Sequence, residues 1–273
     1  MDKRRMCPNC RAFITADDKF CPYCEVQLGP RAIDRRSPPD LLGGIPHVRF
    51  TTLVILLLNA VVYIAMVLAS IRSGGGAGLD FSGRTLVDFG AKYSYAMLQG
   101  QWWRLITAGF LHGGLLHILM NSWALFNVGP QVEESFGTSR HLVIYFTSTV
   151  TGFLASFFFS DAISVGASAG IFGLIGAMIA VGLRDRSGYG AAIRNTYVSW
   201  AVLNLVLGFI GYFAIDNAAH IGGLAGGFGA AFLAGAPGFR PGVERTWQIL
   251  AGASVAATAL AFGIMVTGLL QSG

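Results

Sequence analysis

The chain has 273 residues, of which 53% are hydrophobic and 12% charged, and its formal net charge is +5. An ordinary soluble protein carries charge on about a quarter of its residues, so this composition excludes that class and indicates a membrane protein. Most of this positive charge follows the membrane topology described below. A basic segment that lies against anionic lipid is compatible with it as well. No nucleic-acid partner is expected.

The first segment, residues 1–28, holds all four cysteines of the chain in two CxxC hooks, "CPNC" and "CPYC". Each hook supplies two thiolates from one tight turn, and four thiolates satisfy tetrahedral zinc. The pattern therefore predicts one structural zinc ion bound by Cys7, Cys10, Cys21 and Cys24. So short a segment buries too little surface to fold alone, and zinc would supply most of its folding free energy.

The alternative for the hooks is a pair of redox-active dithiols, but no βαβ pattern surrounds them, and disulfides are not expected in a reducing cytoplasm. The head is similar to small zinc ribbons at the ends of bacterial membrane proteins. That resemblance implies that it binds a cytoplasmic protein partner and does not catalyse. Residues 29–48, rich in Pro, Gly and Arg, are predicted to be a tether between the head and the membrane body.

The rest of the chain contains seven uncharged runs, each near the roughly 20 residues that a helix needs to cross the hydrocarbon core. These predicted spans are 50–71, 105–128, 142–160, 162–183, 195–215, 217–235 and 247–270. They predict an all-α polytopic membrane protein with a core at 49–235, followed by a cytoplasmic loop and a seventh helix at 236–273. No cleavable signal peptide is expected, because the first residues are polar.

The orientation follows from lysine and arginine, which keep short loops in the cytoplasm. The N-terminal segment is rich in both, so the N-terminus is predicted to be cytoplasmic and the C-terminus external, in the bacterial inner membrane. The first external connection, whose aromatic residues favour the membrane interface, breaks this pattern with four basic residues: Arg72, Arg84, Lys92 and Arg104.

Polar residues inside spans are costly and mark candidate functional positions. They are Ser168 in the stretch "SVGASAGIFG", His220 in the sixth span, and His112, His117 and Asn121 in the second. Each one taken singly could simply bond to a neighbouring helix. On this topology, however, all of them lie in the outer half of the membrane. His117 and Asn121 are four residues apart and share a helical face, whereas His112 would lie about 140° away.

Small residues surround the serine and the last histidine. In the fourth span they occupy positions 166, 169, 170, 173 and 176, and in the sixth they are Gly222, Gly223, Gly226 and Gly227. Small-xxx-small spacing lets two helix backbones approach closely, so these two spans are predicted to pack together. That packing would bring Ser168 and His220, 52 residues apart in the sequence, to within about 3 Å of each other.

Residues 50–235 resemble the rhomboid family of intramembrane serine proteases. The resemblance rests on four motifs that occur in the same order along the chain. They are Trp103-Arg104, the HxxxxHxxxN pattern of His112, His117 and Asn121, the GxS pattern of Gly166 and Ser168, and the AHxxGxxxG pattern of Ala219, His220, Gly223 and Gly227. The seventh span is similar to that of the family variant with an extra C-terminal helix.

The resemblance implies a catalytic dyad, with Ser168 as nucleophile and His220 as base. It also implies an oxyanion hole formed by Asn121, His117 and the backbone N–H of Ser168. Supporting positions would be His112, Gly166, Trp103, Arg104 and Phe172, the last where the family often has a tyrosine stacked on the catalytic histidine. Ala169 departs from the family, which usually has glycine after the serine.

By resemblance, the reaction is hydrolysis of peptide bonds in or near transmembrane helices of single-span or polytopic membrane proteins, with no cofactor for catalysis. Substrate helices that unwind easily, with Gly, Pro or small residues near the cleaved bond, are favoured. Three alternatives remain: a rhomboid-like pseudoprotease that binds helices without cleavage, a haem or metal protein using the histidines, and a transporter. The haem or metal hypothesis leaves Ser168, Asn121 and Trp103-Arg104 unexplained. A transporter is disfavoured because the predicted spans contain no acidic residue and no clear inverted repeat.

Overall fold

The computed structural model describes residues 4–7, 9–10, 12–15, 18–28, 50–76, 79–210, 215–235 and 241–272. The chain divides into two compact units, Met1–Ile45 and Pro46–Gly273. The predicted tether at 29–48 lies outside the described residues. The domain boundaries drawn from the sequence therefore stay predictions.

The first unit contains a two-stranded antiparallel sheet of β1 (Arg4–Met6) and β2 (Phe13–Thr15), with Arg5 opposite Ile14. A single antiparallel bridge between Phe20 and Gln27 forms a second, shorter hairpin. Among the described residues of this unit, the buried side chains are two cysteines and two aliphatic residues, Cys7, Cys21, Ile14 and Leu28. So small an apolar core agrees with a unit that needs a further source of stability.

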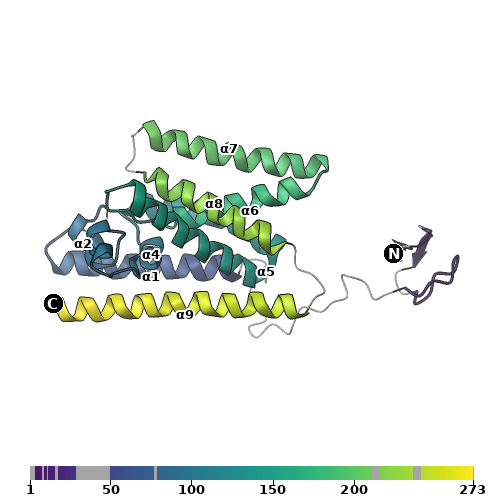
Figure 1. Cartoon of the computed structure of the whole chain (residues 1–273), viewed down its shortest axis with the longest axis horizontal. Coiled ribbons are helices and arrows are strands. Elements are labelled where there is room, and N and C mark those ends of the chain that lie inside the picture. The colour runs from purple at the N-terminus through teal and green to yellow at the C-terminus, as the bar shows by residue number, and fades with distance from the viewer. Residues whose placement is uncertain are drawn as a thin grey trace. The chain divides into compact units, whose positions relative to one another are not determined.

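The second unit is a bundle of helices (Figure 1). In chain order they are α1 (Phe50–Arg72), α2 (Gly83–Asp88), α3 (Ser94–Leu98), α4 (Arg104–Thr107), the 3-10 helix η2 (Ala108–Phe110), α5 (Leu115–Phe159), α6 (Ser168–Arg184), α7 (Gly188–Ile210), α8 (Asn217–Ala234) and α9 (Pro241–Ser272). Among the described residues, four helices are long and apolar enough to cross a membrane: Phe50–Arg72, Leu115–Phe159, Gly188–Ile210 and Gly242–Gln271.

Helix α5 has 45 residues and corresponds to two predicted spans joined end to end. Gly137 interrupts it with φ 75° and ψ 164°, a left-handed backbone conformation that glycine adopts without steric cost. With α5 counted as two helices, the bundle has six core helices and α9 as a seventh. The predicted fold class is therefore confirmed.

Four predicted helix starts differ from the structure. Helix α7 begins at Gly188 and not at 195, and α9 begins at Pro241 and not at 247, whereas two other starts were predicted too early. Helix α5 begins at Leu115 and not at residue 105, because residues 104–110 form the separate short helices α4 and η2. Helix α6 begins at Ser168 and not at 162, because Ser164 and Lys92 pair their backbones as an isolated antiparallel bridge. Hydropathy alone does not separate an apolar helix from an apolar loop buried in protein, and both segments are of the second kind.

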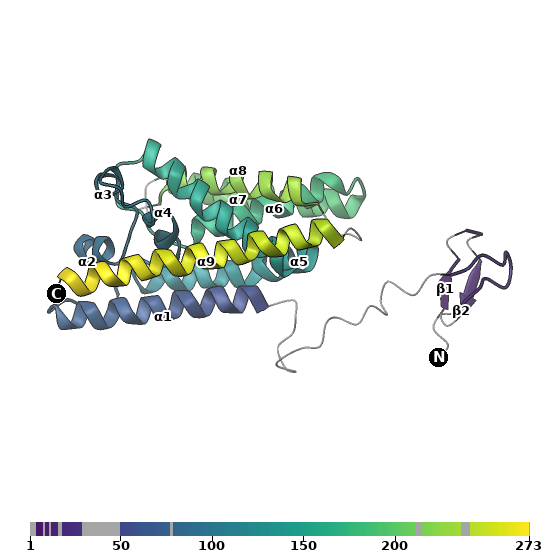
Figure 2. The ribbon, with the colours of Figure 1, turned by 60° about the horizontal axis from the view of Figure 1, so that its bottom comes forward.

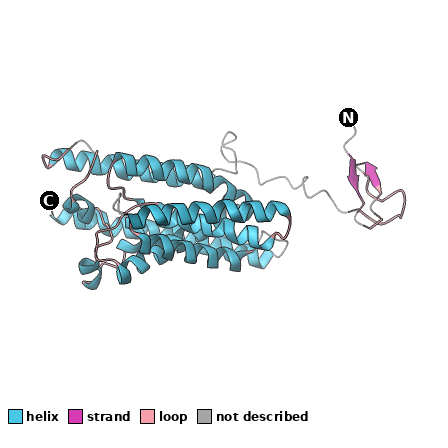
Figure 3. Ribbon diagram, turned by 90° about the horizontal axis from the view of Figure 1, so that it is seen from above, coloured by secondary structure: helices cyan, strands magenta, loops and turns pink. Residues whose placement is uncertain are grey.

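Helix α6 lies at the centre of the bundle, with most of its residues buried, and packs against α5, α7 and α8. Figure 1 shows α7 at one side of the bundle and α9 at the other, and Figures 1 and 2 both show α1 beside α9. The short helices α2, α3 and α4 gather at one end, where α1 and α9 also finish (Figure 2). Figure 3 shows the long helices of this unit side by side, and the two strands of the head in magenta.

The predicted close packing of the fourth and sixth spans is confirmed, and the glycines explain it. A Cβ on Gly223 of α8 would lie 2.1 Å from the carbonyl oxygen of Ala169, and one on Gly227 would lie 2.2 Å from that of Gly173. Two further α8 glycines serve a different contact, because Gly222 and Gly226 face α5. The small residues thus bring three helices together and not only two.

Candidate active site

Ser168 is the first residue of α6, and the segment before it is not helical. Helices leave their first amide groups without intrahelical partners and carry partial positive charge at this end. Gly166 has φ 134° and donates its N–H to the carbonyl of Ala108 over 2.9 Å. The start of α6 therefore places a hydroxyl beside free backbone donors, an arrangement suited to stabilising an oxyanion.

His117 faces the same place from the first turn of α5. Its Nδ1 accepts the N–H of Gly113 over 3.2 Å, so in the neutral imidazole the proton lies on Nε2. A Cβ placed on Gly166 would lie 2.8 Å from this Nε2 and 3.4 Å from Ser168 Oγ. The hydroxyl of Ser168 and the Nε2–H of His117 thus both face the position that a Cβ at residue 166 would fill. Only glycine leaves this position open.

Asn121 and His112 surround His117. Asn121 is buried and donates its amide to the carbonyl of His117 over 3.1 Å. His112 precedes α5 and is not helical, so the angular separation expected for it on an ideal helix does not apply. Its ring packs edge-on against His117 with centroids 5.2 Å apart. Within the described structure, neither nitrogen of this fully buried ring has a hydrogen-bond partner.

His220 lies in the first turn of α8. Asp216 caps that helix by accepting the N–H of Ala219 over 3.0 Å, and the hydroxyl of Ser156 donates to the same carboxylate. The imidazole of His220 stacks on Phe172, with ring centroids 4.1 Å apart and planes inclined by 15°. In the part of the chain that the structure describes, its Nδ1 has no hydrogen-bond partner.

The structure brings Ser168 and His220 to neighbouring helices, which meet at Ala169 and Gly223. Their side chains form no hydrogen bond with each other among the described residues. Catalytic hydrogen bonds are often long without substrate and tighten when it binds, so this geometry is compatible with a dyad.

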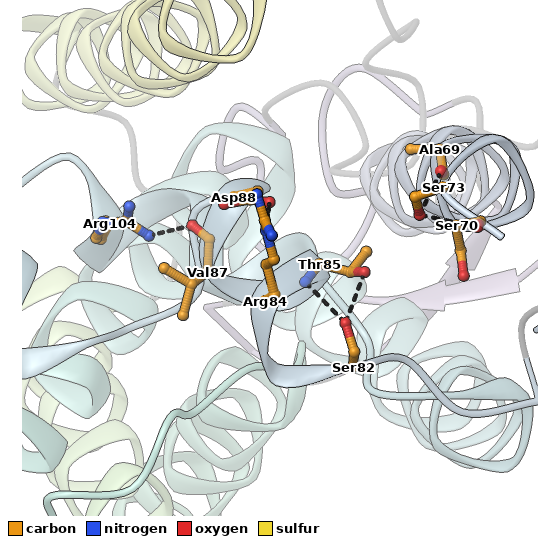
Figure 4. Close-up of polar contacts among 9 residues, drawn as sticks. All are labelled: Ala69, Ser70, Ser73, Ser82, Arg84, Thr85, Val87, Asp88 and Arg104. Carbon is orange, nitrogen blue, oxygen red and sulfur yellow. Dashed lines mark hydrogen bonds and ion pairs between the residues drawn. The ribbon is translucent and has the colours of Figure 1, made fainter. Parts of the chain in front are cut away.

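Trp103 and Arg104 belong to the connection between α1 and α5, where the Arg104 guanidinium lies over the Trp103 ring, 4.7 Å from its centroid. The Arg104 guanidinium donates to Gln101 Oε1 over 2.7 Å and to the carbonyls of Val87 and Ala91 over 2.6 and 3.0 Å. Figure 4 shows Arg104 pointing to Val87, next to the capping contact of Ser82 with Thr85. Arg104 is buried, which explains why a basic residue here does not follow the orientation rule.

Lys92 is a residue that the sequence interpretation did not assign to the site. It is completely buried and donates from Nζ to the carbonyls of Ser160 and Ala162, just before Ser168 in the chain. The available signal was its place among the four basic residues that break the orientation pattern. A basic residue in an external loop, where the orientation rule does not expect one, is a candidate for burial within the protein.

The four cysteines of the head form one cluster, in which all the sulfur atoms lie within 4.8 Å of one another. Cys7 and Cys24 sulfurs are 3.7 Å apart, and those of Cys10 and Cys21 are 3.6 Å apart. A tetrahedral ion with metal–sulfur bonds of about 2.3 Å separates its ligands by about 3.8 Å, so the cluster fits a metal with four thiolate ligands. Hydrogen bonds from the backbone of Val26 and from Asn9 lower the pKa of Cys24 to about 6, which favours the thiolate.

Comparison with known proteins places the chain in a protein family. The family model of the Rhomboid domain matches residues 99–237, more than half of the chain. The chain is 45% identical over 153 residues to rhomboid protease GluP of Bacillus subtilis, covering 56% of this chain and 30% of the relative. It is 41% identical over 157 residues to RHOMBOID-like protein 7 of Arabidopsis thaliana, covering 56% of this chain and 49% of the relative. The chain thus matches less than half the length of these two relatives.

Proposed function

Since the chain belongs to the rhomboid family and is an all-α polytopic membrane protein, we propose that it is an intramembrane serine protease with Ser168 as nucleophile and His220 as base. The observation that carries the proposal is the position of Ser168 at the start of α6, where its hydroxyl and His117 Nε2 border one point. A nucleophile beside preorganised N–H donors is the arrangement that acyl transfer requires.

In the proposed mechanism, His220 takes the proton of Ser168 as the hydroxyl attacks the substrate carbonyl. The resulting oxyanion accepts hydrogen bonds from the Nε2–H of His117, the backbone N–H of Ser168 and the second amide hydrogen of Asn121. His220 then protonates the leaving amine, and water hydrolyses the acyl-enzyme. Among the described residues, no carboxylate accepts a hydrogen bond from His220 Nδ1, so the stacked ring of Phe172 would hold the imidazole in place.

The proposed substrates are membrane proteins whose transmembrane helices unwind near the cleaved bond. A helical carbonyl is engaged in its own hydrogen bond, so attack requires local loss of helix, which Gly, Pro and small residues favour. The orientation proposed from the basic residues places the N-terminal head in the cytoplasm and the C-terminus outside.

For the head we propose a structural zinc ion held by Cys7, Cys10, Cys21 and Cys24. With four protein ligands, zinc has no open position for a substrate, so the ion stabilises the fold and presents the head to a cytoplasmic partner. Catalysis in the membrane unit uses no cofactor in this proposal.

The protease proposal is tested with purified protein in liposomes and a single-span reporter whose helix contains Gly and Pro. We expect cleavage by the wild-type protein and by Ser199→Ala, which alters an exposed serine of α7. Ser168→Ala and His220→Ala should lose cleavage completely while they retain their thermal stability, and a fluorophosphonate should label only proteins that retain Ser168. A folded wild-type protein that neither cleaves nor is labelled would instead support the pseudoprotease alternative.

A further inference from the structure

Lys92 connects two loops that are far apart in the sequence. Its backbone N–H donates to the carbonyl of Ser164 over 3.0 Å, and Ser164 N–H donates back over 3.0 Å. The side chain adds two contacts, because Nζ donates to the carbonyl of Ser160 and, over 3.1 Å, to that of Ala162. One residue of the connection between α1 and α5 thus makes four hydrogen bonds to the segment that ends α5 and leads to α6.

The segment held in this way delivers Ser168 to the start of α6. Residues 160–167 join the end of α5 to Ser168 and contain no helix. Their other backbone anchor is the bond from Gly166 N–H to the Ala108 carbonyl. Since the position of a non-helical segment depends on such tertiary bonds, losing the Nζ contacts would free the part that leads to Ser168.

Lys92 also interacts with the helix that carries the other member of the dyad. Burial lowers the pKa of Lys92, while the carboxylates of Asp216 and Asp161 favour its charged form. Asp216 is the residue that caps α8, four positions before His220. The ammonium group therefore donates to the segment that precedes Ser168 and also experiences the charge of a carboxylate at the start of α8.

We propose that Lys92 is a positioning residue for the dyad, whose buried ammonium group holds in place the segment before Ser168. This inference rests on the proposed protease function. Lys92 acts through the backbone of residues 160–164 and touches no reacting atom. An enzyme without this ammonium group should bind its substrate normally and attack it slowly, since small displacements of a nucleophile are costly.

The test uses Lys92→Met, which keeps the length of the side chain and removes its donors, and Lys92→Gln, which keeps an N–H donor without charge. The matched control is Arg84→Met in the same connection, since the Arg84 side chain is 92% exposed and pairs with Asp88 at 3.8 Å. The readouts are the rate of Ser168 labelling by a fluorophosphonate, kcat and KM for the reporter, thermal stability, and hydrogen exchange of residues 160–167.

We expect Lys92→Met to lower the labelling rate and kcat by about tenfold or more, with KM changed by less than about twofold. Hydrogen exchange should accelerate in 160–167 and not in α1. Lys92→Gln should recover part of the rate, and Arg84→Met should behave as the wild type. Wild-type kinetics in Lys92→Met, or no recovery at all in Lys92→Gln, would overturn the inference.

Failure to fold is also decisive. If Lys92→Met does not fold but Lys92→Gln does, the labelling rate and the hydrogen exchange of Lys92→Gln are compared with those of the wild type. We then expect slower labelling and faster exchange in Lys92→Gln. If both variants unfold, Lys92 is a general stability residue and the inference is wrong. An unlabelled, inactive wild-type protein contradicts the proposed function itself, whereas an active wild type with an unaffected Lys92→Met contradicts only the role of Lys92.

Discussion

The ring of Phe172 lies flat against the imidazole of His220, with 4.1 Å between the centroids and 15° between the planes. Phe172 comes from α6, one turn after Ser168, so the helix that supplies the proposed nucleophile also supplies the surface on which the proposed base rests. A stacked ring restricts rotation of the imidazole without altering its charge. In the proposed dyad, this contact would take the place of the carboxylate that orients histidine in a triad.

A first prediction concerns this stacking. Phe172→Tyr retains the flat face and should cleave the reporter within about twofold of the wild-type rate. Phe172→Leu keeps an apolar side chain but loses the face, so kcat should fall about tenfold while stability changes by roughly 1 kcal/mol. Cleavage kinetics and thermal unfolding in detergent provide the measurement. Equal kcat values for the two variants would mean that stacking does not orient His220.

A second prediction concerns the contact between α6 and α8. Gly223→Ala places a methyl group 2.1 Å from the carbonyl oxygen of Ala169, so the helices must separate. A shift on the order of 1 Å between Ser168 and His220 should reduce cleavage by about 100-fold. The control is Gly229→Ala on the same helix, where a Cβ meets nothing within 4 Å. If both variants cleave equally fast, close helix contact is not required for activity.

A third prediction concerns the head. Metal analysis of the purified wild-type protein should find about one zinc per chain, because four thiolates complete a tetrahedral site. The double substitution Cys7→Ser and Cys10→Ser should remove the metal and make the head sensitive to proteolysis. The membrane unit has its own core, so reporter cleavage should persist in this variant. A wild-type head that is folded and free of metal would contradict the prediction.

A fourth prediction concerns the attachment of α9. Arg140 is buried beside the kink of α5 and makes two hydrogen bonds to Glu244, of 2.7 and 2.8 Å. Glu244→Gln leaves the arginine charge without its carboxylate and should destabilise the protein by about 1 to 3 kcal/mol, seen as a lower melting temperature. The neighbouring Arg245→Gln, at an exposed position, should leave the melting temperature unchanged. Equal effects of the two substitutions would contradict a specific role for Glu244.

Much of the architecture could be predicted from residue patterns along the chain. Uncharged runs predicted the long helices because a span must satisfy its own backbone inside the hydrocarbon core. Paired CxxC hooks predicted the cysteine cluster because ligand spacing in a tight turn is a local property. The helix starts at Leu115 and Ser168 were missed, since the apolar residues before them are buried by contacts with distant parts of the chain.

In the candidate site, too, some features could be predicted from residue patterns and others depended on the tertiary structure. Ser168, His220 and their glycines were identified because polar and small residues inside apolar runs are conspicuous. Lys92 was recognised only as a departure from the orientation rule, because its partners are carbonyl groups, which every residue has. The position of His112 before α5, and its packing against His117, also depended on where the helix begins.

The sequence by itself determined which residues are candidates for chemistry, how many long helices the membrane unit forms and where small residues permit close contact. Only the tertiary structure decided that Phe172 stacks on His220, that His117 and Ser168 border one open point at Gly166, and that Lys92 ties the segment before Ser168 in place. The reason is physical. Helix formation and membrane burial depend on local composition, whereas the geometry of a site depends on backbone groups brought together from distant segments.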